Sequence, residues 1–562
     1  AGASTEAKAV DPSFDPAQAG APSVEPSFGT EFWAASRAEV GEFVVRWRAP
    51  PAPGSCVADA AAMLRLPDRN IFLATDFELR PSCGAGSLVE LELPADGLRQ
   101  RYASFPPLPS PLPSSPTALP LAAAAGLRAW HLQDTVFLTP RSQIWLKLST
   151  DEPPLQPRSV AAQVLLTLLG KAIGEALNEI AYLADQASLH IWVCSQNYGL
   201  DVKVGGFHHK LPSLLEAGLQ EVFAFADAAT WKRRLQDRAF VARLEGQREQ
   251  LLRGYRNAYM RPGDHAADLR RLLVMPHRHG APEKARALEG IGLRQLAAYA
   301  QELIPKLRAE VLVAGNATAE DAEHLVGALP ESLREGAPLG EVPRQPPLPT
   351  AMLPSGVPTL WVEASPDTGN RNVAVELHWQ LGASAEPRPR AVCDLLEALM
   401  SEPLFDDLRT KQQIGYVASC GMRYTQGVLG FSIWLLSSKV VPSEICKRVE
   451  VFLADFRKRV ADFSPADFER HVCSLAGQKL EPDRTLLSVQ EGAWAELQER
   501  KRMFDRPLQE AVQLATMSRE DVLDLLDRCI LPGAPQRRLA VVAVVGGQAK
   551  TTAAAELEAL SK

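Results

Sequence analysis

The segment from Phe405 to Val417 carries the residue types and spacing best suited to chemistry in this chain of 562 residues. Arg409 and Tyr416 are seven positions apart, close to two turns of a helix, so both can project from one side. We expect Gly415 to end that helix just before the tyrosine. A guanidinium and a phenol placed together suit peptide carbonyls and a developing oxyanion. The alternative, which the spacing alone favours, is an arginine paired with Asp406 and a tyrosine packed at a strand start.

No other arrangement of residues predicts a catalytic or metal site. The ten histidines include no pair three or four positions apart, and neither H-E-x-x-H nor H-x-x-E-H occurs. We interpret His208-His209 and His277-Arg278-His279 as surface loops. There is no G-x-S-x-G nucleophile elbow and no phosphate loop, and we interpret Cys194 and Cys420 as small hydrophobes. The sequence therefore predicts no metal ligand in this chain.

The elements that must position these residues form two blocks with the same order. In the first block the residue pattern predicts two strands, one long helical stretch, a strand anchored by glycine, several helices and a closing strand. Thr318 and Asp321 then lie at capping-box spacing and predict the start of another helix. The predicted ranges are Thr135 to Leu138, Ile144 to Leu148, Ser159 to Ala187, Tyr198 to Val204, Pro212 to Arg308 and Val311 to Gly315.

The second block repeats this order. Gly199 and Gly427 are 228 positions apart, and Gly315 and Gly546 are 231 positions apart. Two pairs of equivalent glycines separated by nearly the same number of residues predict a duplicated α+β domain. The predicted ranges are Thr359 to Glu363, Val373 to Trp379, Arg390 to Met400, Glu402 to Ile414, Gly427 to Trp434, Ser443 to Arg528 and Leu539 to Val545.

Two proline-rich segments separate the blocks from each other and from the N-terminal residues. Ser104 to Ala125 and Pro338 to Pro358 contain proline at a density that breaks both helices and strand ladders. We interpret both as exposed linkers. The alternative is that these runs bind grooves lined by aromatic residues.

Composition excludes several classes of protein. With 60 Lys plus Arg and 67 Asp plus Glu, the net charge of −7 argues against a general polyanion binder, nucleic acid included. Every apolar stretch is shorter than the roughly 18 residues of a membrane-spanning helix, so none is expected. Eight scattered cysteines without a C-x-x-C pair favour reduced thiols. The first residues lack an initiator Met and a targeting pattern, so we interpret them as a processed terminus or a cut through a longer chain.

Ser401 to Tyr416 reads SEPLFDDLRTKQQIGY. At this segment the chain resembles the insulysin, nardilysin and pitrilysin family of inverzincin metallopeptidases, whose phrase is close to S-E-P-x-F-x-x-L-R-T-K-E-Q-L-G-Y. Further matches run in the family's order and cover about residues 25 to 545. They are Phe28 to Thr30, Leu66 to Phe72, Thr75 to Glu78, Trp130 to Pro140, Leu177 to Tyr182, Gly315 to Thr318 and Ala534 to Arg538.

The resemblance implies a fold and a set of domains. The family's full chain has four homologous α+β domains, in two halves that close around a chamber, and this sequence resembles the C-terminal half. The implied fold is α+β, with two homologous domains that each pack helices on a mainly antiparallel sheet. The implied domains are the tail of a preceding domain plus linker (1–60), an inter-half connector with a Pro-rich loop (61–125), a third domain (126–337), a linker (338–358) and a fourth domain (359–562).

The resemblance also implies where the metal lies. The family's zinc motif H-x-x-E-H and its distal glutamate belong to the first domain, so zinc would be bound by the N-terminal half of the complete enzyme and not by this chain. Here the helix from Gly170 to Ala187 occupies the place of the zinc-bearing helix. It carries Asn178, Glu179 and Tyr182 instead of the motif, so Glu179 is not expected to be a zinc ligand.

The arginine and tyrosine of the family phrase reach across the chamber to the active site. By resemblance, Arg409 would orient main-chain carbonyls of the substrate, and Tyr416 would donate a hydrogen bond to the oxyanion formed by zinc-activated water. The implied function is therefore that of the zinc-free half of a zinc metalloendopeptidase that degrades short peptides. This half is expected to be inactive alone.

The implied partners are the N-terminal catalytic half, in the same full-length chain or as a separate subunit, and peptide substrates. Homodimerisation is a family expectation. An alternative function is a complete non-catalytic subunit that binds peptides or scaffolds a complex. The expected compartment is the cytoplasm, with mitochondria as the alternative, because cysteines are sparse and signals are absent.

Overall fold

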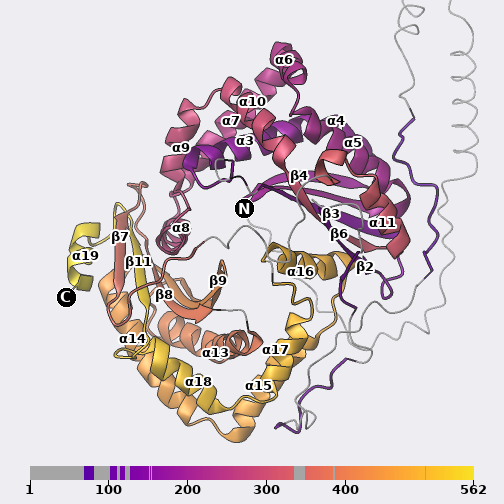
Figure 1. Cartoon of the computed structure of the whole chain (residues 1–562). Helices are drawn as coiled ribbons and strands as arrows, with labels where there is room; N and C mark the ends of the chain where they lie inside the picture. The colour runs from indigo at the N-terminus through magenta and orange to yellow at the C-terminus, as the bar shows by residue number, and fades with distance from the viewer. Residues whose placement is uncertain are drawn as a thin grey trace, which may run out of the picture. The chain divides into compact units, whose positions relative to one another are not determined.

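The computed structural model describes residues 69–81, 101–109, 114–119, 127–150, 152, 155–334, 349–383, 386–499 and 501–561. Residues Ile71–Lys562 form one compact unit. This unit contains two mixed sheets, each packed with helices (Figure 1). The predicted segment 1–60 lies outside the described residues, and the predicted domain boundaries stay predictions.

The first sheet has the strand order β1-β2-β6-β3-β5-β4. β2 and β6 are parallel, and all its other neighbouring strands are antiparallel. The strands are β1 (Thr117–Ala118), β2 (Leu127–Gln133), β3 (Arg141–Ser149), β4 (His190–Gln196), β5 (Gly199–Phe207) and β6 (Arg308–Gly315).

The second sheet has the strand order β7-β11-β8-β10-β9. β7 and β11 are parallel, and the other neighbouring strands are antiparallel. The order β7-β11-β8-β10-β9 therefore repeats the order β2-β6-β3-β5-β4 of the first sheet. This repeat confirms the predicted duplication and the α+β class. The strands are β7 (Thr359–Ala364), β8 (Val373–Ala383), β9 (Val417–Thr425), β10 (Val428–Ser437) and β11 (Leu539–Val545).

Helices cover both sheets. Those of the first block are α3 (Val160–Ala176), α4 (Asn178–Gln186), α5 (Leu211–Ala224), α6 (Ala228–Gln236), α7 (Arg238–Asn257), α8 (Pro262–Val274), α9 (Ala281–Gly290), α10 (Leu293–Leu303), α11 (Ala319–Gly327) and α12 (Glu331–Arg334). Those of the second are α13 (Pro387–Leu404), α14 (Pro442–Ala461), α15 (Pro465–Leu480), α16 (Leu486–Gln498), α17 (Arg506–Leu514), α18 (Arg519–Leu525) and α19 (Ala553–Ser561). Short segments of 3-10 helix (His208–Lys210, Ile304–Lys306) and of π-helix (Phe405–Lys411, Leu526–Ile530) each lie between a helix and a strand.

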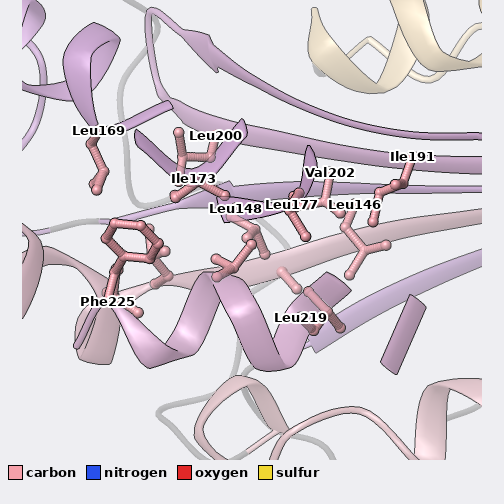
Figure 2. Packing of buried hydrophobic residues seen from close by; sticks show 14 of the residues in the cluster. Leu146, Leu148, Leu169, Ile173, Leu177, Ile191, Leu200, Val202, Leu219 and Phe225 are labelled. Carbon is pink, nitrogen blue, oxygen red and sulfur yellow. The ribbon is translucent and has the colours of Figure 1, made fainter. Parts of the chain in front are cut away.

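The core of the first sheet lies between its strands and the first-block helices. Leu146 and Leu148 of β3 and Leu200 of β5 belong to one buried cluster with Leu169 and Ile173 of α3 (Figure 2). Strand side chains alternate between the two faces of a sheet, so these leucines lie on one face of β3 while Trp145 and Lys147 lie on the other. The second face is buried as well.

The second face of each sheet is covered by a helix from the other block. Trp494 of α16 packs on Trp145 of β3 and Leu312 of β6. In the same way, Leu269 of α8 packs on Ala374 of β8 and on β11. α8 begins at residue 262 and α16 at residue 486, which is close to the offset of the duplication. The two equivalent helices are thus exchanged, and this explains why β3 and β8 are buried on both faces.

Several predicted elements are confirmed, and others differ from the structure. Thr318 and Asp321 form the predicted capping box of α11. Thr135 to Leu138 is not a strand: the Asp134 carboxylate accepts hydrogen bonds from the N–H groups of Val136 and Phe137, and Leu138 has a φ of 48°. These bonds turn the chain between β2 and β3. The long helix predicted from Ser159 to Ala187 is two helices that meet at Leu177.

The two proline-rich segments are only partly exposed. Phe105 packs with Tyr102 into the core of the second sheet, and β1 pairs with β2. Leu353 is also buried, and its N–H donates to Gln380 Oε1 over 2.9 Å. The exposed-linker interpretation is therefore wrong at these positions, because apolar side chains inside a proline-rich run still find a core. Residues 110–113, 120–125 and 338–348 lie outside the described residues.

Among the described residues, no single helix has the length and apolar composition to cross a membrane. α3 and α4 reach that composition only together, with a bend of 55° between them.

Candidate functional site

The segment singled out by its sequence lies on a helix that changes its winding. α13 runs to Leu404 and continues directly as a π-helix from Phe405 to Lys411. Two separate helices were predicted over this stretch, and that division is wrong. Pro403 lacks an N–H to donate within the last turn of α13, and the winding widens just after it.

Arg409 is exposed on the π-helix. Its guanidinium lies over the ring of Phe405, 4.6 Å from the ring centroid. Asp406 does not pair with it, because Asp406 Oδ2 binds Lys411 Nζ at 2.7 Å instead. The ion pair that the structural alternative required is therefore not made, and Arg409 has no acidic partner among the described residues.

Tyr416 follows the π-helix and precedes β9. Its backbone N–H donates to the Leu436 carbonyl over 3.2 Å, so the main chain is held at the edge of β10. Its side chain is 54% exposed, so the phenol is not packed away at the strand start. The backbone and the side chain thus have different environments: the first is fixed and the second is open to solvent.

Gly415 has a different role from the one predicted. The helix ends at Lys411, so Gly415 is not its C-terminal residue. A Cβ on Gly415 would lie 2.0 Å from the Leu436 carbonyl oxygen. Glycine is therefore required here because two backbones approach closely.

Two buried residues anchor this segment. Leu408 and Ile414 are both fully buried in the core of the second sheet. The N–H of Ile414 donates to the Leu408 carbonyl over 3.0 Å, and the Ser437 hydroxyl donates to the Ile414 carbonyl. Arg409 on the π-helix and Tyr416 after it therefore project from a segment that Leu408 and Ile414 fix to the core.

The described residues do not fit a zinc site. Asn178, Glu179 and Tyr182 of α4 are exposed, and they bring one carboxylate and no imidazole. Among the described residues, no group of three His, Cys, Asp or Glu side chains could hold a metal ion. No step that depends on a metal is therefore assigned to residues of this chain.

His277-Arg278-His279 lies in the partly exposed loop between α8 and α9, as predicted, whereas His208-His209 differs from the predicted surface loop. His208 is buried, and its Nδ1 lies 3.0 Å from Asn316 Nδ2. Its Nε2 lies 3.5 Å from the Asp76 carboxylate. His209 Nδ1 accepts hydrogen bonds from the N–H groups of Thr75 and Asp76. His208 and His209, which directly follow β5, thus hold the segment near residue 76 against the end of that strand.

The two cysteines behave as small hydrophobes. Cys420 is buried, and burial raises the pKa of its thiol to about 11. Burial also raises the pKa of the half-buried Cys194 thiol. Both thiols are therefore protonated near neutral pH and are poor nucleophiles.

A cavity of about 960 Å³ was not predicted from the sequence. Its walls come from the start of α3, the α8–α9 loop, the β4–β5 turn, the β9–β10 turn and the end of α16. Segments from both blocks thus meet around the cavity. Their positions along the chain do not predict that they meet. The walls include Arg158, Lys284 and Gln426.

Comparisons with known proteins agree with this architecture. A family model described as the middle or third domain of peptidase M16 matches residues 14–287. A second model, described as the C-terminal lobe domain 4 of PQQ synthase PqqF-like proteins, matches residues 395–494. The first model thus covers residues before the first block and most of that block, and the second model covers the middle of the second block.

Curated relatives match most of this chain. A nardilysin-like protein of Arabidopsis thaliana is 29% identical over 430 residues, which are 74% of this chain and 39% of that protein. The insulin-degrading enzyme of Drosophila melanogaster is 26% identical over 483 residues, which are 85% of this chain and 46% of that enzyme. The chain thus spans less than half the length of these relatives.

Solved structures show the same fold. Pitrilysin superposes with a TM-score of 0.69 at 19% identity, over 88% of this chain and 47% of that one. A peptidase M16 inactive domain from Pseudomonas fluorescens superposes with a TM-score of 0.57 at 14% identity, over 78% of this chain and 98% of that one. By its family models, curated relatives and fold, this chain is similar to the M16 peptidases, among them nardilysin, insulin-degrading enzyme and pitrilysin, and the family resemblance predicted from its motifs is confirmed.

Proposed function

We propose that this chain is the C-terminal, zinc-free half of an insulysin-like zinc metalloendopeptidase that degrades short peptides. The observation that carries the proposal is the exposure of Arg409, without an acidic partner among the described residues, together with the exposed phenol of Tyr416. The matches to a third-domain model and to a domain 4 model support the assignment to a C-terminal half.

The two side chains suit two parts of peptide hydrolysis. The planar guanidinium of Arg409 offers several N–H donors and binds main-chain carbonyls of a peptide, which orients the substrate. The Phe405 ring beneath it restricts the directions in which it can point. The phenol of Tyr416 donates a hydrogen bond to the anionic oxygen that develops on the attacked carbonyl.

The proposal divides the active site between two partners. Zinc and its ligands belong to the N-terminal catalytic half, since this chain's described residues do not fit a metal site. That half is supplied by the same full-length chain or by a separate subunit. This chain contributes the substrate-orienting and oxyanion-binding groups and part of the chamber wall.

Complementation tests the proposal. The purified chain is assayed for bound zinc by mass spectrometry and for cleavage of a fluorogenic peptide, alone and after addition of a matching N-terminal half. The expected result is no stoichiometric zinc and no cleavage alone, and cleavage by the pair. A pair whose N-terminal half carries a disabled H-x-x-E-H motif is the control. Chelator-sensitive cleavage by the chain alone would contradict the division of roles.

A second candidate function is a non-catalytic subunit that binds peptides or scaffolds a complex. The observation that favours it is that this chain covers 98% of a solved M16 domain described as inactive. The same experiment separates the two functions. Peptide binding by this chain without cleavage by any pair supports the second function and contradicts the first.

A further inference from the structure

The cavity between the two blocks contains polar atoms that lack partners. Gln156 is only 7% exposed, and its Oε1 has no hydrogen-bond donor among the described residues. The buried Oε1 of Gln426, on the β9–β10 turn, also lacks a donor there. Both residues line the cavity, so the walls present at least two acceptors that a ligand with N–H groups could satisfy.

The cavity also contains cationic groups without acidic partners. The buried Nε of Arg158 has no hydrogen-bond acceptor among the described residues. Lys284 forms no ion pair there either, and Asp268, the acid whose charge acts on it, accepts a 2.9 Å hydrogen bond from Arg278 Nε instead. Burial and the Arg278 charge lower the pKa of Lys284. A bound anion would relieve this repulsion.

The remaining charges of the cavity are largely balanced. Lys147 Nζ lies 4.0 Å from Glu310 Oε2, and Lys501 Nζ lies 3.6 Å from Glu499 Oε2. The uncompensated groups are therefore two cations and two amide oxygens, and a ligand that suits them carries one negative end and neighbouring N–H donors. A volume of about 960 Å³ is larger than an isolated ion needs and falls within the usual range of organic ligand sites.

We propose that this cavity binds the carboxyl-terminal end of a short peptide, with the carboxylate at Arg158 and Lys284 and the last peptide N–H groups at Gln156 and Gln426. The carboxylate forms charge-assisted hydrogen bonds, and the N–H groups satisfy the two amide oxygens. This site is separate from Arg409 and Tyr416, which do not line the cavity.

Calorimetric titration of the purified chain tests the proposal. The probes are tetra-alanine with a free carboxyl end, tetra-alanine amide and inorganic phosphate. The free acid is expected to bind at least about tenfold more tightly than the amide, because a hydrogen bond to a charged group contributes about 1.5–3 kcal/mol. Equal binding of acid and amide, or no binding of the acid, would overturn the proposal. Binding of phosphate without binding of the acid would also overturn it, since that outcome identifies an ion site.

Matched variants locate the binding. Lys284→Gln and Arg158→Gln are each expected to weaken binding of the free acid about tenfold and to leave the amide unchanged. Lys458→Gln removes the same charge from the exposed surface of α14 and is expected to change nothing. Circular dichroism checks that each variant folds, and unchanged binding in both cavity variants would contradict the assignment. Because only this chain is titrated, the result is independent of whether complementation yields a peptidase.

Discussion

The indole rings of Trp145 and Trp494 meet edge to face, with centroids 5.6 Å apart and planes at 90°. Trp145 lies on β3 of the first sheet, and Trp494 lies on α16, which belongs to the second block. Both rings are buried. This contact, together with the packing of α8 on the second sheet, joins the two blocks within one compact unit.

Replacing Trp494 with alanine should therefore destabilise both blocks together. Loss of a buried aromatic side chain costs about 3–5 kcal/mol, so the free energy of unfolding in urea should fall by that order. Trp192→Ala is the control, because Trp192 is 54% exposed on the edge strand β4 and should cost about 1 kcal/mol or less. Equal losses in the two variants would contradict the assigned role of the Trp145–Trp494 contact.

Gly415→Ala should destabilise the chain and displace Tyr416. The added methyl would meet the Leu436 carbonyl oxygen at 2.0 Å, and overpacking of this kind costs about 1–3 kcal/mol. Gly477→Ala is the matched control: nothing lies within 4 Å of its Cβ, and the residue is inside α15. There alanine should stabilise the helix by up to about 1 kcal/mol. Thermal unfolding of both variants measures the difference in stability. A Gly415→Ala variant as stable as the unaltered chain would contradict the close backbone approach at this position.

Arg409→Ala and Tyr416→Phe should lower kcat/KM of the complemented peptidase. Removal of one oxyanion donor typically lowers turnover about 10²–10³-fold. Both side chains are exposed, so the free energy of unfolding should change by no more than about 0.5 kcal/mol. Lys411→Ala, in the same π-helix, is the control and should retain activity. Unaltered rates in both variants would remove their assigned roles.

His378 should make the chain less stable in acid. It is buried beside Ser432, and its pKa is lowered to about 3 by burial and then by the charges of Arg270 and Arg423. The unfolded chain takes up the proton near its ordinary pKa of about 6.5, whereas the folded chain does not. Stability that is complete above that pH is therefore lost progressively as the pH falls toward 3.

His378→Gln should flatten this dependence. Urea midpoints measured between pH 7 and pH 4 would show a smaller decline for this variant than for the unaltered chain. His324→Gln is the control, since His324 is exposed on α11 and should leave the slope unchanged. A slope that survives in His378→Gln would mean that other groups cause it.

Local patterns predicted the parts of the fold that depend on neighbours in the chain. Alternating apolar residues identified β5, β8 and β10, and the capping residues Thr318 and Asp321 placed the start of α11. The spacing of Gly199 and Gly427 identified the duplication, because equivalent turns recur at one offset. The edge strands β4 and β9 were not picked out, since their mixed side chains face several environments.

By itself, the sequence determined the α+β class, the duplication, the family resemblance and the segment that carries Arg409 and Tyr416, because each is written in local periodicity or in a continuous motif. Only the tertiary structure decided that Asp406 pairs with Lys411 and not with Arg409, that α8 and α16 are exchanged, and that a cavity forms between the blocks. These features depend on contacts between residues far apart in the chain, such as Trp145 and Trp494, which are more than 300 positions apart. Spacing along the chain does not encode which distant surfaces meet, because burial and packing of the whole unit select them.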